Sequence, residues 1–266
     1  MSPWIHEQFL NKAELDGTYS LAEINPEENF EEKLKQLKNE ETDGFNITAP
    51  YKEKIIPFLD RLDDTAKHMQ AVNTVVAKDG KWYGYNTDSQ GFMRSLENSY
   101  PDYFEKEEKK TLIIGAGGAA RAIYYGLVTS GITEVDIANR TLSKAEEIAA
   151  LGKGKTTTMV HTIDQAEKLQ HTYDLIIQTT SIGMNQSADQ TVITIKNLKK
   201  DAIVSDIIYQ PIKTKFLKEA EQANGRIHFG HAMLLYQAQY AFEIFTGNLV
   251  DATRMDDKLK QILEGR

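Results

Sequence analysis

The apolar run Thr111–Ile114 leads directly into a glycine-rich turn, Gly115, Ala116, Gly117, Gly118 and Ala119, which Ala120 follows. A buried strand, a glycine turn and a helix that begins near Ala119 place backbone N–H groups and the positive end of a helix dipole against a phosphate. Gly115 permits the tight turn, Gly117 lets a phosphate approach the backbone, and Ala120 is an acceptable third small residue. The pattern therefore predicts a dinucleotide site, with a turn that serves packing only as the alternative.

The next predicted strand, Glu134–Ala138, ends at Asn139, Arg140 and Thr141, where chains that bind NAD usually carry Asp or Glu. An acidic residue at this place binds the ribose 2′-hydroxyl, whereas Arg140, with Lys144 on the following turn, offers cations to a 2′-phosphate. The sequence therefore favours NADP over NAD as the cofactor.

The chain of 266 residues is long enough to bury a large core and to form two domains. Its formal net charge of −8 argues against nucleic acid as a partner, which requires a basic stripe. Cysteine is absent and the six histidines lack metalloenzyme spacing, so neither disulfides, thiolate catalysis nor a metal is expected. Without a leader or a long apolar segment, the chain is expected to be cytoplasmic and to have no membrane partner.

Residues 111–229 alternate short apolar strands with helices. Six strands joined by helices predict an α/β fold with a parallel, doubly wound sheet of the Rossmann type. Gly225 stands where a helix over Thr214–Asn224 would end. The strands are expected at Thr111–Ile114, Glu134–Ala138, Thr156–Val160, Asp174–Thr179, Ala202–Ile208 and Arg226–Phe229.

The first part of the chain has a different pattern, with a helix expected over Pro26–Asn39, a strand over Gly44–Ile47 and a helix after Pro50. Residues 79 and 80, Asp-Gly, predict a hairpin turn between the segments 72–76 and 82–86. A two-residue loop pairs Asn73 with Asn86, and Asp88 lies just beyond this pair. Polar residues therefore gather at one end of the hairpin.

The segment Ala232–Thr246 predicts a helix with an apolar stripe and with Gln237 at the edge of that stripe. Because the nucleotide fold is complete at Phe229, this helix is expected to return to the first domain. The organisation is then a discontinuous α/β substrate-binding domain formed by residues 1–88 and 231–266, and a nucleotide-binding domain formed by residues 89–230. The charged stretch Phe104–Lys110 is interpreted as a solvated connector.

Lys52 falls in the first turn of the helix expected after Pro50, where the helix dipole disfavours a cation by about 0.3–1 kcal/mol. This cost hints at a use such as proton transfer, and the alternative is a surface lysine balanced by Glu53. Asp88 has an equally simple alternative, as the N-cap of a helix over Ser89–Leu96. Asn73 and Asn86 could likewise be turn residues of the hairpin and not ligand contacts. Pattern alone does not join Lys52 to Asp88.

Seven motifs occur in one order along nearly the whole chain. They are residues 46–53 (NITAPYKE), 71–74 (AVNT) and 84–88 (GYNTD), followed by GAGGAAR, NRT, TSIGMN and SDIIYQP. In their joint order and spacing they resemble shikimate dehydrogenase, although no single motif is decisive.

The resemblance implies a role for each matching residue. Lys52 and Asp88 correspond to the catalytic lysine and its aspartate partner, both in contact with the substrate. Other substrate contacts are implied at Thr48, Asn73 and Gln237 for the ring hydroxyls and at Ser2 and Tyr209 for the carboxylate. On the cofactor side, the resemblance implies Gly115–Ala119 at the pyrophosphate, Asn139, Arg140, Thr141, Leu142, Ser143 and Lys144 at the ribose phosphate, and Asp64, Ile207 and Gly230 near the nicotinamide, with Met233 at the family spacing.

The implied reaction is reversible hydride transfer between NADPH and the ring ketone of 3-dehydroshikimate, a small molecule, to give shikimate on the route to aromatic amino acids. Lys52 supplies a proton to the ketone oxygen and Asp88 orients it. One alternative is a quinate/shikimate dehydrogenase that prefers NAD, which Arg140 and Lys144 argue against. Another is a catalytically impaired nucleotide-binding protein. A monomer or a homodimer is expected.

The start of the chain departs from the family pattern, which opens with an apolar strand, a Gly-Asn-Pro turn and His-Ser-x-Ser-Pro. This chain begins at Met1, Ser2 and Pro3. Because the site residues downstream are kept, we expect the sequence to begin at an internal Met of a longer natural chain, and the alternative is a shortened protein.

Overall fold

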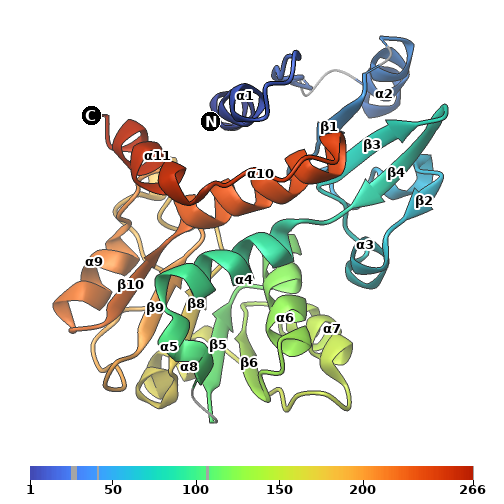
Figure 1. Ribbon diagram of the computed structural model, residues 1–266. Helices are drawn as coiled ribbons and strands as arrows, with labels where there is room; N and C mark the ends of the chain where they lie inside the picture. The colour runs from blue at the N-terminus through green and yellow to red at the C-terminus, as the bar shows by residue number, and fades with distance from the viewer. Residues whose placement is uncertain (25–28, 41, 106–107, 266) are drawn as a thin grey trace. The chain divides into compact units, whose positions relative to one another are not determined.

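The computed structural model describes residues 1–24, 29–40, 42–105 and 108–265, and Figure 1 shows its helices and strands. The chain folds into two compact units. The first comprises Met1–Thr87 and Ala238–Asp251, and the second comprises Asp88–Gln237 and Ala252–Arg266.

The second unit contains a six-stranded sheet in the order β10-β9-β8-β5-β6-β7, in which all neighbouring strands are parallel. The strands are β5 (Lys110–Ile114), β6 (Glu134–Ala138), β7 (Val160–His161), β8 (Leu175–Gln178), β9 (Ile203–Asp206) and β10 (Arg226–Phe229). The predicted doubly wound parallel sheet is confirmed.

Helices cover both faces of this sheet (Figure 1). Successive residues of a strand point to opposite faces, so each strand contributes side chains to both layers of helices. In β5, Ile113 packs in one apolar cluster, whereas Leu112 and Ile114 pack in the other. The first cluster includes side chains of α4 (Asp88–Ser99), α5 (Pro101–Glu105), α6 (Gly118–Thr129) and α7 (Leu142–Ala149), and the second includes side chains of α8 (Ile163–Leu169) and α9 (Lys215–Gln222). Burial on both faces explains why the strands are continuous apolar runs.

One strand of this sheet differs from its predicted position. A strand was expected over Thr156–Val160, but β7 covers only Val160–His161, with an isolated bridge between Thr157 and Glu134 before it. β7 lies at the edge of the sheet and pairs with β6 alone. An edge strand forms backbone hydrogen bonds with one neighbour, whereas a central strand forms them with two. The apolar pattern of the sequence therefore predicts the bounds of an edge strand less well.

The first unit contains a four-stranded mixed sheet in the order β1-β3-β4-β2. Its strands are β1 (Gly44–Asn46), β2 (Arg61–Leu62), β3 (Thr74–Lys78) and β4 (Lys81–Tyr85). The predicted hairpin is confirmed, since Thr74 pairs with Tyr85 and Lys78 with Lys81. The turn residues Asp79 and Gly80 have φ of 53° and 71°, as two-residue hairpin turns require.

Two sets of helices pack in this unit. Leu34 of α2 (Phe30–Asn39) and Ala66 of α3 (Asp64–Met69) join a core with Val75 and Trp82 of the sheet. On α1 (Ser2–Lys12), the ring of Phe9 lies 5.5 Å from that of Phe242, near the end of α10 (Gly230–Thr246). The expected helix over Pro26–Asn39 matches α2 from Phe30 onward, and its residues 26–28 lie outside the described residues.

The helix expected after Pro50 is absent from the structure, and this prediction was wrong. Residues 49–55 form successive turns, followed by the short 3₁₀ turn Ile56–Phe58. The carbonyl of Lys52 accepts the N–H of Val72 at 2.9 Å, and the N–H of Ile56 donates instead to Glu53 at 3.3 Å. The carbonyl that an α-helix would use therefore bonds to the neighbouring chain segment.

The two compact units differ from the expected domain bounds at three places. Asp88 and residues 231–237 and 252–266 were expected in the first domain, but they lie in the second unit. Nε2 of His231, near the start of α10, lies 3.3 Å from Oδ1 of Asp256 in α11 (Asp256–Leu263). A Cβ added to Gly91 of α4 would lie 2.6 Å from the backbone nitrogen of Gln237, so α4 and this half of α10 pack closely.

Two general features of the described residues bear on function. None of their helices is both long and apolar enough to span a bilayer. Their His, Asp and Glu side chains also form no group of three or more that is placed to hold a metal ion.

The burial of His6 leads to a pH prediction. This histidine of α1 is 2% exposed and its ring stacks on that of Tyr19 at 4.1 Å, and burial lowers its pKa from 6.5 to about 4. A lowered pKa in the folded state contributes stability above pH 6.5 that is lost as the pH falls toward 4. We expect His6→Phe, which keeps an aromatic ring against Tyr19, to reduce the loss of unfolding free energy between pH 7 and pH 5 by about 2 kcal/mol.

Tryptophan fluorescence during urea unfolding measures this effect, because both tryptophans, Trp4 and Trp82, belong to the first unit. The control is His171→Gln, since His171 is exposed and belongs to the second unit. The prediction would be contradicted if the unfolding free energy of the His6→Phe variant fell by as much between pH 7 and pH 5 as that of the unmodified chain.

Candidate functional site

The glycine turn after β5 adopts the geometry that the sequence predicts. Gly115 has φ of 117°, a conformation that favours glycine. A Cβ at this position would collide with Oγ1 of Thr179, which follows β8. The N–H of Gly115 donates to the carbonyl of Ala138 at 2.8 Å, and Thr179 Oγ1 donates to the carbonyl of Ile114 at 2.8 Å. The turn thereby joins the carboxyl ends of β5, β6 and β8.

The helix after this turn can receive an anion. α6 has Gly117 as its N-cap, and neither a side-chain cap nor an acidic residue is found in its described first turn. A Cβ built on Gly117 or Gly118 would meet nothing within 4 Å, so open space lies beside the backbone. Uncapped N–H groups next to open space fit a pyrophosphate, as the sequence of Gly115–Ala119 predicts.

The segment Asn139–Lys144 follows β6 at the same edge of the sheet. The Asn139 side chain donates to the carbonyl of Thr141 at 2.8 Å, which shapes the entry to α7. Arg140 and Lys144 are exposed, and neither forms an ion pair with another described residue. α7 has no acidic residue in its first turn. Two exposed cations beside an uncapped helix start fit a phosphate group.

Ile207 and Gly230 are brought together at the ends of β9 and β10, where Asp206 pairs with Phe229. A Cβ on Gly230 would collide with the carbonyl group of Ile207 and would lie 2.7 Å from the carbonyl oxygen of Ile208. Glycine is therefore required at 230 by close backbone approach. Met233, one turn later, is 9% exposed and packs in the apolar cluster that contains Ile113.

Asp206, the last residue of β9, is fully buried and accepts three hydrogen bonds. Its Oδ1 accepts from the N–H of Ile208 at 3.0 Å and from Gln178 Nε2 at 3.2 Å, and its Oδ2 accepts from Thr214 Oγ1 at 2.6 Å. Burial raises the pKa of Asp206 to about 6, against the opposing effect of these hydrogen bonds.

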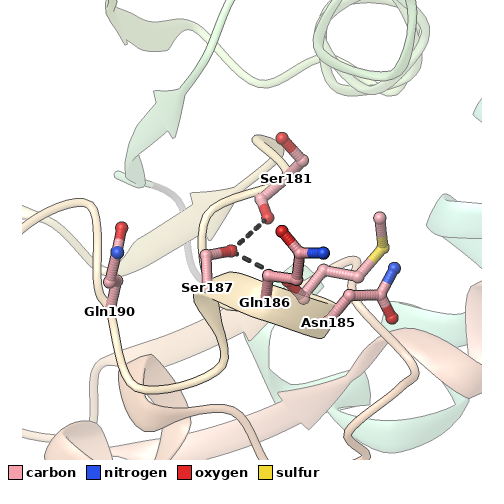
Figure 2. A pocket seen from close by; sticks show the side chains of 6 residues that line it. Ser181, Asn185, Gln186, Ser187 and Gln190 are labelled. Carbon is pink, nitrogen blue, oxygen red and sulfur yellow. Dashed lines mark hydrogen bonds between the residues drawn. The ribbon is translucent and has the colours of Figure 1, made fainter.

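The loop after β8 forms a shallow depression of about 540 Å³, lined by Ser181, Met184, Asn185, Gln186, Ser187 and Gln190 (Figure 2). Ser187 Oγ donates to the carbonyls of Met184 at 2.8 Å and Ser181 at 3.2 Å, and it accepts the N–H of Gly183 at 3.1 Å. One serine thus holds the loop together. The loop begins next to Thr179, which contacts the glycine turn.

In the first unit, polar side chains meet at the open end of the hairpin. Asn73 Oδ1 accepts the N–H of Thr87 at 2.9 Å, and Asn73 Nδ2 donates to Thr87 Oγ1 at 3.0 Å. Asn86 Nδ2 donates to the carbonyl of Ala71 at 3.0 Å. The predicted pairing of this end of the hairpin is confirmed, and both asparagines are buried.

The other predicted first-unit residues lie in separate local settings. Lys52 is partly buried in the turns after Pro50, and Thr48 is exposed where those turns begin. Ser2 starts α1, and Asp64 is the exposed first residue of α3. Since no helix follows Pro50, Lys52 does not experience the helix dipole that the sequence predicts.

Three predicted substrate residues belong to the second unit. Asp88 is the first residue of α4 and is 6% exposed. Gly91, on the next turn of α4, packs directly against Gln237, whose Nε2 donates to the carbonyl of Leu234 at 2.9 Å. Tyr209 is partly buried in the loop after β9. Lys52 and Asp88 belong to different units, so their pairing stays a prediction.

Sequence reasoning missed the buried polar residues Gln178, Asp206 and Thr214. Asp206 stands in the motif SDIIYQP, within the predicted apolar strand Ala202–Ile208. A carboxylate within an apolar strand was the available signal, because burying one requires hydrogen-bond partners.

Three family models match the chain in succession. Residues 1–75 match "Shikimate dehydrogenase substrate binding domain". Residues 101–211 match "Shikimate / quinate 5-dehydrogenase", and residues 230–260 match "Shikimate 5'-dehydrogenase C-terminal domain". Together these matches cover most of the chain.

Individual relatives agree with the family models. The shikimate dehydrogenase (NADP(+)) of Oceanobacillus iheyensis is 51% identical over 266 residues, which are 100% of this chain and 95% of that protein. The crystal structure of shikimate dehydrogenase from Aquifex aeolicus has a TM-score of 0.83 at 37% identity and covers 99% of this chain and 91% of its own. The structure of shikimate 5-dehydrogenase from Thermus thermophilus, in complex with NADP(H) and shikimate, has a TM-score of 0.85 at 28% identity, with coverage of 98% and 94%. The chain therefore belongs to the shikimate dehydrogenase family.

Proposed function

We propose that the chain catalyses the reversible NADPH-dependent reduction of 3-dehydroshikimate to shikimate, a step toward aromatic amino acids. The observation that carries the proposal is the similarity of the whole chain to NADP-dependent shikimate dehydrogenases, and the motifs that contain Lys52 and Asp88 support it. The parallel six-stranded sheet of the second unit supports the proposal, because such sheets bind nucleotides at the carboxyl ends of their strands.

The cofactor side of the proposal rests on two features of the second unit. The uncapped start of α6 at Gly117 and Gly118 would hold the pyrophosphate, and Arg140 with Lys144 would hold the 2′-phosphate. NADPH supplies the hydride when bound. The alternative of an NAD-preferring quinate/shikimate dehydrogenase is not favoured, because Arg140 stands where NAD sites carry an acid.

The proton transfer is assigned to Lys52. As the ketone carbon becomes tetrahedral, negative charge develops on its oxygen, and the Lys52 ammonium donates a proton to that oxygen. In the oxidative direction, the neutral amine removes the proton from the same hydroxyl. Asp88 orients the ammonium group and the neighbouring substrate hydroxyl.

Substrate binding is assigned to five further polar residues. Thr48, Asn73 and Gln237 would bind the ring hydroxyls, and Ser2 and Tyr209 would bind the carboxylate. The hydrogen bonds between Asn73 and Thr87 support this role, because they fix the orientation of the Asn73 amide before substrate arrives. Asp64, Ile207 and Gly230 would lie near the nicotinamide.

The proposal extends to the setting of the reaction. Because cells produce and consume NADPH internally, we place the activity in the cytoplasm. The working form is proposed to be a monomer or a homodimer.

The purified chain should oxidise shikimate with NADP⁺ and do so poorly with NAD⁺. Absorbance of the reduced nicotinamide measures both rates. Cofactor binding without turnover of shikimate would contradict the proposed function and favour a catalytically impaired nucleotide-binding protein.

Replacing the proposed proton donor should separate catalysis from binding. We expect Lys52→Ala to lower kcat by about 10²–10⁴-fold, the range for a lost general acid, and to leave the Kd for shikimate nearly unchanged. Steady-state kinetics and calorimetric titration measure the two quantities. Lys54→Ala is the matched control, because Lys54 is an exposed lysine of the same turns. Full turnover by the Lys52→Ala variant would remove the assignment.

Removing the two exposed cations should change the choice of cofactor. We expect the double variant Arg140→Ala, Lys144→Ala to raise KM for NADPH by roughly 10–100-fold, because charge-assisted hydrogen bonds to the 2′-phosphate are lost. KM for NADH should stay unchanged, since NADH lacks that phosphate. Lys168→Ala, at an exposed lysine of α8, is the control. A parallel rise in both KM values would place the 2′-phosphate elsewhere.

A further inference from the structure

A single carboxylate holds both ends of the loop formed by residues 207–213. Oδ1 of Asp206 accepts the N–H of Ile208 at the start of this loop, and its Oδ2 accepts the hydroxyl of Thr214, which ends it. Thr214 Oγ1 in turn accepts the N–H of Leu217 at 3.3 Å as the N-cap of α9. The loop is therefore fixed to the sheet at one end and to a helix at the other.

The same carboxylate also contacts the loop after β8. Gln178 Nε2 donates to Asp206 Oδ1 and to the carbonyl of Ile182 at 3.0 Å, and Gln178 Oε1 accepts the N–H of Thr180. Asp206 and Gln178 are both fully buried. Two loops at one edge of the sheet thus share one buried anchor.

The backbone of the neighbouring segment limits the remaining freedom of the loop. Gly230, the first residue of α10, packs against the carbonyl groups of Ile207 and Ile208, so the first part of the loop has little room to move toward the start of α10. The loop carries Ile207 and Tyr209, whose proposed contacts are the nicotinamide and the substrate carboxylate. A small shift of this loop would move both contacts, and misplacement by about 1 Å can cost a large factor in rate.

We propose that Asp206 is a positioning residue for the reaction, which holds the loop of residues 207–213 so that Tyr209 meets the substrate carboxylate. This inference rests on the proposed function. It assigns Asp206 no contact with substrate or cofactor, because its oxygens are used by Ile208, Gln178 and Thr214.

The test compares two buried carboxylates of one sheet. Asp206→Ala removes all three hydrogen bonds, and Asp206→Asn keeps an acceptor oxygen for Ile208 and Gln178. Asp174→Asn is the matched control: Asp174 is 5% exposed, stands just before β8 at the amino ends of the strands, and accepts the N–H of Lys110 at 3.1 Å and Lys199 Nζ at 2.9 Å. Thr214→Val and Thr214→Ser form a second pair, in which only serine keeps the hydroxyl.

We expect Asp206→Ala to raise KM and Kd for shikimate roughly tenfold, the equivalent of one lost interaction, with a smaller change for Asp206→Asn. Thr214→Val should also raise KM for shikimate, whereas Thr214→Ser should have the KM of the unmodified chain. Asp174→Asn should lower the urea midpoint and leave KM for shikimate unchanged. Hydrogen exchange of the free protein should be faster in residues 207–213 of the Asp206→Ala variant and unchanged there in the control.

Several outcomes would overturn the positioning role. One is an unchanged KM and Kd for shikimate in the Asp206→Ala variant, and another is an equal rise in the Asp174→Asn variant. If Asp206→Ala does not fold, equal KM values for Thr214→Val and Thr214→Ser overturn it instead. Failure of the unmodified chain to oxidise shikimate would refute the proposed function itself, and the hydrogen-exchange result separates that case because it needs no turnover.

Discussion

The parallel direction of all six strands in the second unit is the constraint on which its chemistry depends. Parallel strands bring their carboxyl ends to one edge, where open α/β sheets bind ligands. The glycine turn at Gly115, the cations after Asn139, the loop after Thr179 and the anchor Asp206 all follow strands at this edge. Two glycines there are required because neighbouring groups come close: Thr179 approaches Gly115, and the Ile207 carbonyl approaches Gly230.

Features set by local chemistry could be predicted from the sequence. The hairpin followed from its Asp-Gly turn, because both residues must adopt positive φ in a two-residue loop. The central strands followed from apolar runs that are buried on both faces, as Ile113 and its neighbours Leu112 and Ile114 show. The geometry of the glycine turn at Gly115 was predictable for the same reason, since a glycine turn between strand and helix is a local pattern, and its role in cofactor binding stays a prediction.

Features set by distant partners could not be predicted in this way. The helix expected after Pro50 fails because the Lys52 carbonyl bonds to Val72, a contact that periodicity does not reveal. The second-unit location of residues 252–266 depends on packing such as that of Asp256 near His231. Asp206 was overlooked because one of its partners, Gln178, belongs to another strand, and pattern alone does not show which strands become neighbours. The roles of Lys52 and Asp88 came from family resemblance alone, and their pairing stays a prediction.

Arg140 and Lys144 stand exposed with no acidic partner among the described residues. Dissolved anions can then bind these two cations in competition with a phosphorylated ligand. Debye screening also weakens the attraction between exposed charges that lie more than about 8–10 Å apart at physiological ionic strength. If these two cations bind the 2′-phosphate as proposed, cofactor affinity depends on the salt content of the surroundings. An internal carboxylate would have buffered these cations against such changes, at the cost of opposing the ligand's own negative charge.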